Sequence, residues 1–263
     1  MRHFAPVLLL AIPLQSLFAE ERIETDRHDF TQAPTVVSRG RAQLEFGYSY
    51  FEKSSVGESE TSHTTPETLL RIGVMDNLEF RIRYNEAWRF GEAEHLSGSE
   101  DLRVALKTRL SDQFGIVPES ALEIRSSVPT GDNDWSTGEV EFGLDYIYGW
   151  RINESLEFYG STGFATNALG DFAVTRDDTD DNFLLYTQSV ALGWELTETS
   201  TLYFEFFGLF TDGFEDNDVS PVFFNVGQDF FFGNSFVLDI RVGYGLNDDA
   251  DDFFCGIGGG VRF

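Results

Sequence analysis

The sequence predicts an all-β protein, specifically a transmembrane antiparallel up-and-down β-barrel of about twelve strands. Three observations predict this fold class. Apolar and polar residues alternate strictly in one segment after another, the connections between these segments alternate between short and long, and the chain begins with an export signal. The alternation is clearest in residues 42–50, where even positions are apolar or aromatic and odd positions are polar or small. A period of two is typical of a strand whose two faces meet different surroundings.

The first nineteen residues have the composition of a signal peptide. Arg2 and His3 give a positive start, residues 7–14 are apolar, and Ala19 fits a cleavage point before a polar stretch. The apolar stretch is too short to cross a bilayer as a helix. We therefore expect residues 1–19 to be a signal peptide and residues 41–263 to form the barrel.

Residues 20–40 lack the alternation of a strand, and two interpretations remain open for them. They form either a periplasmic N-terminal segment or a plug that folds back into the lumen, with Arg27 or Asp29 pairing to the opposite wall. A disordered tail is common at chain termini.

Twelve segments carry the alternation, and two classes of connection join them. The expected strands span 41–53, 67–75, 77–88, 99–110, 119–128, 138–150, 155–165, 183–196, 200–211, 220–232, 235–246 and 253–263. The longer connections are 54–66, 91–98, 129–137, 167–182, 212–219 and 247–252, and shorter ones fall between them. Short periplasmic turns and longer external loops are typical of bacterial outer-membrane barrels.

A soluble sandwich or lipocalin-like barrel could use the same strands, with the apolar face inside. The uniform apolar face, the aromatic residues near strand ends and the export signal favour the membrane barrel, whose apolar face contacts lipid. The C-terminal Phe263 lies in register with Val261 and Ile257 on that face. It resembles the assembly signal that the barrel insertion machinery reads, so outer-membrane lipid and this machinery are the expected partners.

The polar face of the strands separates charges by sign. The expected basic wall of the lumen contains Arg71, Arg81, Arg83, Arg103, Lys107, Arg109 and Arg125. The expected acidic wall contains Glu141, Asp145, Glu157, Glu195, Glu205, Asp229 and Asp239. Two interpretations follow: a polarised pore with a transverse field, or two walls that neutralise one another and fill a narrow interior. Twelve strands lie between the filled eight-stranded barrels and the wide porins.

Composition excludes several other functions. An excess of 45 Asp and Glu over 18 Lys and Arg repels nucleic-acid phosphate, and a single Cys excludes a disulfide scaffold. Three loops are acidic, with four Asp or Glu each near residues 177–181, 212–218 and 248–252. They could bind calcium or simply remain solvated, and none has the spacing of an EF-hand loop. We expect neither a metal nor a cofactor.

Residues 24–51 carry a resemblance to a known family. Asp26, Arg27 and Asp29, then Pro34 and Gly40, precede a first strand with Gln43, Glu45, Gly47 and Tyr50. This opening resembles the MetA-pathway phenol-degradation family of bacterial outer-membrane transporters, although His28 stands where that family usually has Pro. Residues 65–67, 70–73 and 78–81 are similar to the second and third strands of the family. The resemblance implies an outer-membrane channel for small compounds, aromatic ones among them.

The leading hypothesis is a monomeric channel in the cell outer membrane of a Gram-negative bacterium, through which small solutes enter passively. A closed structural or adhesin-type barrel that acts through its acidic external loops is the alternative. A lipid hydrolase at the outer rim, built from His63 or His95 beside Ser62 and Ser97, is the third hypothesis, and we expect no enzyme.

Overall fold

The computed structural model describes residues 22–27, 30–55, 58–91, 95–132, 135–136, 138–166, 183–212 and 219–263. The named elements of this part of the chain are all strands. They are β1 Ala42–Ser55, β2 Glu58–Met75, β3 Leu78–Phe90, β4 His95–Ser99, β5 Leu102–Ser111, β6 Glu119–Val128, β7 Phe142–Asn153, β8 Leu156–Thr166, β9 Leu184–Thr197, β10 Ser200–Asp212, β11 Val222–Phe231, β12 Phe236–Gly245 and β13 Phe253–Arg262. The signal peptide, residues 1–19, lies outside the described residues, as does Asp29.

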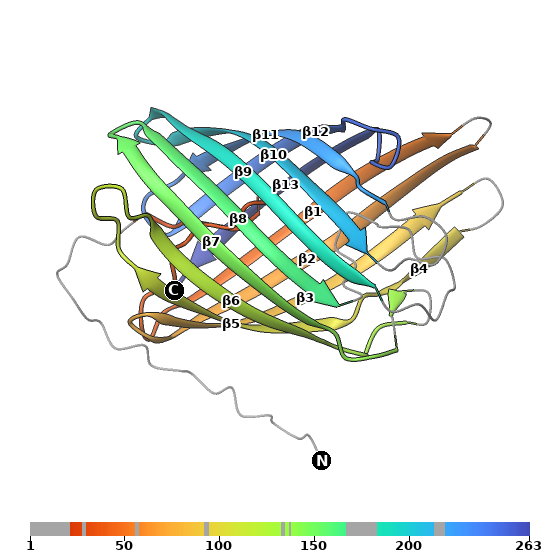
Figure 1. Ribbon diagram of the computed structural model, residues 1–263, viewed down its shortest axis with the longest axis horizontal. Helices are drawn as coiled ribbons and strands as arrows, with labels where there is room; N and C mark the ends of the chain where they lie inside the picture. The colour runs from red at the N-terminus through yellow and green to blue at the C-terminus, as the bar shows by residue number, and fades with distance from the viewer. Residues whose placement is uncertain are drawn as a thin grey trace, which may run out of the picture.

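The strands form one closed antiparallel barrel, in which each strand is tilted against the barrel axis (Figure 1). Closure comes from β1, which pairs with β2 on one side and with β13 on the other. Both β4 and β5 pair with β3, one after the other, so together they occupy a single place. The described residues therefore form a barrel of twelve positions, and the predicted fold class and strand number are confirmed.

The break between β4 and β5 has a local cause. The Asp101 carboxylate accepts hydrogen bonds from the backbone N–H groups of Thr130 and Gly131, at 3.0 and 2.9 Å. This turns the chain toward the next loop where a strand residue would otherwise continue the ladder with β3.

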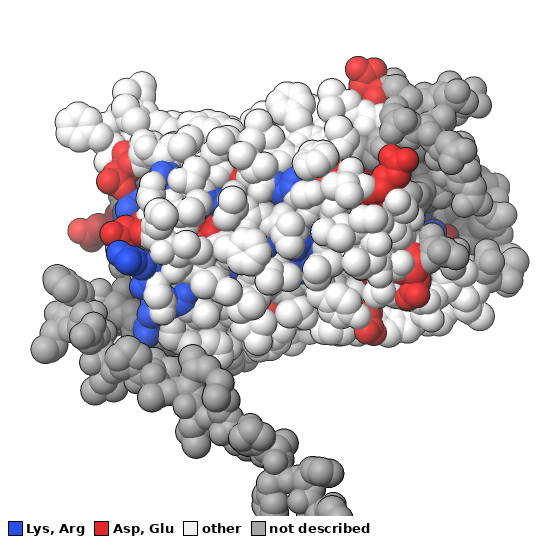
Figure 2. All heavy atoms as spheres, turned by 90° about the horizontal axis from the view of Figure 1, so that it is seen from below, with Lys and Arg blue, Asp and Glu red and all other residues white. Residues whose placement is uncertain are grey.

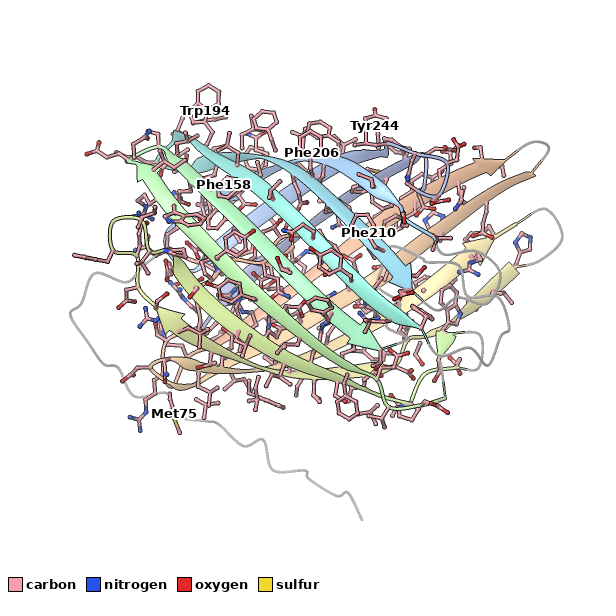
Figure 3. The ribbon with its side chains drawn as sticks, in the orientation of Figure 1. Met75, Phe158, Trp194, Phe206, Phe210 and Tyr244 are labelled. Carbon is pink, nitrogen blue, oxygen red and sulfur yellow. The ribbon has the colours of Figure 1, made fainter. Side chains whose placement is uncertain are left out.

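The two faces of each strand differ as the alternation predicts. On β10, Phe206 is 52% exposed on the outer surface, while its neighbours Glu205 and Phe207 are buried inside. Figure 2 shows that uncharged side chains cover most of the middle of the outer surface, with Asp and Glu gathered toward the two ends. Trp194, Phe206 and Tyr244 point away from the barrel (Figure 3). The outer face therefore suits the hydrocarbon of a bilayer.

The first two external connections differ from the prediction. Residues 54–66 and 91–98 were expected to be loops, but β2 begins at Glu58 and β4 covers His95–Ser99. These stretches are polar and so lack hydrophobic alternation. They pair as strands because β1 and β3 extend beside them, with Thr61 opposite Glu52 and Phe90 opposite His95. The result is two hairpins that continue the barrel wall beyond its apolar band.

The two ends of the barrel are different. One end, the short-turn end, carries tight connections such as that between β11 and β12, where Gly233 has a φ of 73°. The other end, the long-loop end, carries the remaining connections, including residues 129–141 and 246–252. In outer-membrane barrels the short turns face the periplasm. None of the described residues forms a helix long and apolar enough to cross a membrane.

Candidate functional site

The N-terminal segment, residues 22–41, enters the barrel lumen and leaves it by the same end. Near its start the Ile23 N–H donates to the Asn234 carbonyl at 2.9 Å, in the β11–β12 turn. Near its end the Gly40 N–H donates to the Gly73 carbonyl at 2.8 Å, close to the β2–β3 turn. Between these two anchors at the short-turn end, the segment contacts inward side chains from strands around the barrel.

Asp26 is the centre of the largest charge cluster. Its carboxylate lies 3.6 Å from both the Arg71 guanidinium and the Lys107 ammonium, and it also pairs with Arg81. The Asp26 side chain is 1% exposed and that of Lys107 is 0% exposed. Burial alone would raise the pKa of the Asp26 carboxyl, but the three cations outweigh burial and hold this pKa well below its usual range.

The neighbouring residue, Arg27, reaches the other side of the lumen. Its Nη1 lies 2.7 Å from a Glu67 carboxylate oxygen and its Nε lies 3.6 Å from Asp239. The guanidinium occupies the space beside Gly47 and Gly258, where any Cβ would collide with it. These two glycines leave room for the side chain between β1 and β13.

The tip of the segment is held by one carboxylate. Glu205 of β10 accepts hydrogen bonds from the backbone N–H of Phe30 at 2.9 Å and of Thr31 at 2.6 Å, and from the Thr31 hydroxyl at 2.7 Å. The Phe30 ring stacks on Phe207, with centroids 4.9 Å apart and planes 5° apart. Bonds to backbone N–H groups require the segment's conformation rather than any particular side chain at these positions.

Beyond the tip, the inner face near the long-loop end is apolar. Phe207 stacks on Phe223 at 4.8 Å, and both contact Phe254 edge-on. Phe51 and Leu209 belong to the same buried cluster. The predicted polar lumen therefore has an aromatic wall from β1, β10, β11 and β13, which the sequence analysis did not foresee.

The segment separates two cavities in the lumen. The loop-side cavity, of about 170 Å³, is lined by Asp26, Arg27 and Phe30 of the segment and by strand residues nearer the long-loop end. The turn-side cavity, of about 950 Å³, is lined by Glu24, Thr25 and Ala33 and by strand residues near the short turns. Burial raises the pKa of the Glu24 carboxyl, which hydrogen-bonds Thr35 at 2.6 Å.

The structure places the residues of the expected basic wall in three groups. Arg71, Arg81 and Lys107 surround Asp26. Arg83, Arg103 and Arg125 line the loop-side cavity, and Arg125 pairs with Asp145 of the next strand at 2.8 Å. Arg109 lines the turn-side cavity and pairs with Asp112 at 3.2 Å.

The residues of the expected acidic wall lie farther apart. Glu205 and Asp239 bind the N-terminal segment, and Glu195 pairs with Arg22 at 3.5 Å. Glu157 pairs with Arg151 at 2.8 Å, Asp229 lines the turn-side cavity, and Glu141 is buried. The N-terminal segment thus contacts both walls, with Asp26 on the basic one and Arg27 on the acidic one.

Four acids among the basic residues were missed. Glu45 and Glu79 lie 3.0 and 2.8 Å from Arg71, Glu123 pairs with Arg81, and Glu67 pairs with Arg27. All four are inward-facing and nearly fully buried. The signal was present in the sequence, since Glu45 and Glu79 occupy the polar positions of their alternating strands.

The residues of the less favoured hypotheses have other contacts. His63 Nδ1 lies 2.7 Å from the Tyr48 hydroxyl, and the His63 and His95 rings both pack against Phe90. In the third acidic loop, Asp249 accepts a hydrogen bond from the Ser220 N–H at 2.9 Å, and burial raises the pKa of Asp251 to about 6. The described residues contain no group of three or more His, Cys, Asp and Glu side chains placed to hold a metal ion. Residues 177–181, 215, 216 and 218 lie outside the described part of the chain.

Phe263 is 53% exposed, and its backbone pairs with that of Ala42 at the seam where the barrel closes. Its service as a signal for the insertion machinery stays a prediction.

The sequence matches one protein family, described as the MetA-pathway of phenol degradation, over residues 25–263. The chain belongs to this family. No curated protein matches the sequence.

Solved structures with a similar fold are outer-membrane barrels. The translocator domain of the autotransporter NalP from Neisseria meningitidis has a TM-score of 0.56 at 12% identity, over 86% of this chain and 90% of that chain. The transport unit of the autotransporter AIDA-I from Escherichia coli has a TM-score of 0.52 at 10% identity, over 86% and 91%. The KdgM porin, solved in complex with disordered oligogalacturonate, has a TM-score of 0.50 at 8% identity, over 84% and 99%. With its closed barrel and apolar outer band, this member of the phenol-degradation family is located in the outer membrane.

Proposed function

We propose that the protein is a channel for passive uptake of small solutes, and that its N-terminal segment is a plug that closes the lumen. The observation that carries this proposal is the pair of cavities, about 170 and 950 Å³, that lie on either side of residues 22–41 in one lumen. A filled barrel would have side chains packed across this space. Here the barrier between the two cavities is a chain segment without strand pairing, which can leave without breaking the barrel.

The contacts of the segment suit a removable barrier. Both of its anchors and all of its lumen contacts are non-covalent, and the tip is held by hydrogen bonds and ion pairs. Its buried apolar side chains are few, with Ile23 and Val37 near the short-turn end. Polar contacts can be replaced by water when the lumen opens, so the net free energy of docking is a small difference between large terms.

The aromatic solute that the family description suggests has support in the lumen itself. Phe30, Leu185 and Leu209 line the loop-side cavity, and Phe207, Phe223 and Phe254 form the wall behind them. A flat ring can pass along such a wall by contacts with apolar side chains, which do not hold it strongly.

Planar-bilayer recordings of the refolded mature chain test the proposal, with a matched variant that begins at Gly40. We expect discrete conductance from the truncated barrel and a lower or intermittent conductance from the full mature chain. Equal conductance in the two proteins would remove the plug. Silence from both, with the β-sheet circular dichroism of a folded barrel, would remove the channel and direct attention to the external hairpins.

A further inference from the structure

We infer that the loop-side cavity is a binding site for a small aromatic carboxylate, which deepens the proposed function and rests on it for its biological role. The inference starts from two arginines. Arg83 of β3 and Arg103 of β5 are direct partners across the two strands, and both line the cavity. Like charges that lie directly opposite one another destabilise a strand pair.

The same barrel contains a second opposed pair, which shows how this fold compensates such a repulsion. Arg71 and Arg81 are direct partners across β2 and β3. A carboxylate oxygen of Glu79 lies 2.8 Å from Arg71 and 3.2 Å from Arg81, so it bridges both guanidiniums. At Arg83 and Arg103 the cavity adjoins the pair, and Arg103 has a long ion pair of 3.9 Å with Glu100.

The acids that line the cavity are engaged by other cations. Glu67 pairs with Arg27, Glu123 with Arg81, and Asp145 with Arg125. They therefore have little capacity to attract a second cation, and a cationic solute would meet the Arg83–Arg103 pair. A solute carboxylate can accept parallel hydrogen bonds from guanidinium groups, which favours an anion in this position.

The opposite side of the cavity favours a ring. Phe30, Leu185 of β9 and Leu209 of β10 line it, and β9 and β10 lie across the barrel from β3 and β5. The Phe30 ring is fixed by its stacking on Phe207. A cavity of roughly 150 Å³ holds one benzene ring in a protein core, so about 170 Å³ suits one ring with a small substituent. The site combines an arginine pair at one side with an apolar wall at the other, as benzoate requires.

Calorimetric titration of the refolded mature chain in detergent tests the inference, with benzoate as the probe. Benzyl alcohol has the ring without the charge, acetate has the charge without the ring, and benzylamine has the opposite charge. We expect benzoate to bind more tightly than all three. In the double variant Arg83→Gln with Arg103→Gln, benzoate affinity should fall by about tenfold or more, since a hydrogen bond to a charged group contributes roughly 1.5–3 kcal/mol.

Arg151→Gln is the matched control, because Arg151 lies near the β7–β8 turn and lines the other cavity. It should leave benzoate affinity unchanged. Equal affinity for benzoate and benzyl alcohol, or a double variant that binds benzoate as the wild type does, would overturn the site. Because binding is measured without a membrane, a conducting barrel that ignores benzoate refutes the site alone, and a silent barrel that binds benzoate refutes the channel alone.

Discussion

Replacing Asp26 by Asn removes one buried charge and keeps the shape of the side chain. In the Asp26→Asn variant, the amide oxygen of the new side chain can still accept the hydrogen bond that the Ala33 N–H donates to Asp26 at 3.0 Å. Lys107 keeps its 2.5 Å hydrogen bond to the Ala33 carbonyl but loses the carboxylate at 3.6 Å. The variant therefore tests the charge and little else.

The size of the effect follows from burial. At 3.6 Å and an effective dielectric constant of about 20, one charge pair is worth roughly 4–5 kcal/mol. Removing one partner of a buried pair costs about 3–5 kcal/mol. We expect docking of the N-terminal segment to weaken by that amount, a factor of roughly 100 to 4,000 in the docking equilibrium. The barrel should remain folded, because its strand pairing does not depend on the segment.

Trypsin measures this equilibrium directly, because it cleaves after Arg27, whose residue is only 9% exposed when docked. Cleavage should be much faster in Asp26→Asn, and bilayer recordings should show a higher open fraction. Asp112→Asn is the control, since the Asp112 side chain is 81% exposed in its pair with Arg109 and should have no measurable effect. If folded Asp26→Asn is cleaved and conducts like the wild type, the charge cluster does not hold the segment.

Three further predictions follow from the same lumen. Because burial raises the pKa of Glu24 above its ordinary 4.5, the docked segment binds an extra proton; the closed fraction in bilayer recordings should increase as pH falls through the raised pKa toward 4.5, and Glu24→Gln should abolish this dependence. Gly47→Ala places a methyl group on the Arg27 guanidinium, so overpacking of about 1–3 kcal/mol should speed tryptic cleavage, and unchanged cleavage would show that Arg27 has a second position. Phe207→Ala should lower the free energy of unfolding in urea by about 3–5 kcal/mol, while its outward neighbour Phe206→Ala should have a much smaller effect; equal losses would refute the inward packing.

The barrel could be predicted from the sequence because lipid imposes the same requirement on every strand. Each outward position must be apolar, so the period of two is visible in single strands such as residues 42–50. Beyond the lipid this requirement ends. Residues 58–66 are strand without alternation, and only their pairing with β1 and β3 shows it.

The pairing of charges in the lumen could be predicted less well. Alternation gives the side of a strand on which a residue lies, but its ion-pair partner depends on register and on what else enters the lumen. Glu79 was on the correct face, yet its bridging of Arg71 and Arg81 requires the register that places these two arginines opposite one another. The position of Asp26 depends on a segment with no periodic pattern, so no strand rule could place it.

The two sequence-based interpretations of the lumen, a polarised pore and a neutralised interior, describe two states of one barrel. With the segment docked, Asp26 neutralises cations on β2, β3 and β5, while Arg27 and the backbone N–H groups of the tip satisfy Asp239 and Glu205 on β12 and β10. These strands lie on different sides of the barrel, so the walls are too far apart to pair directly and meet through the segment. Withdrawal of the segment uncovers Lys107 on one side and Asp239 on the other. The open lumen then carries the transverse field that the separated charges predict, and the energy of rehydrating those groups is what the docked segment avoids.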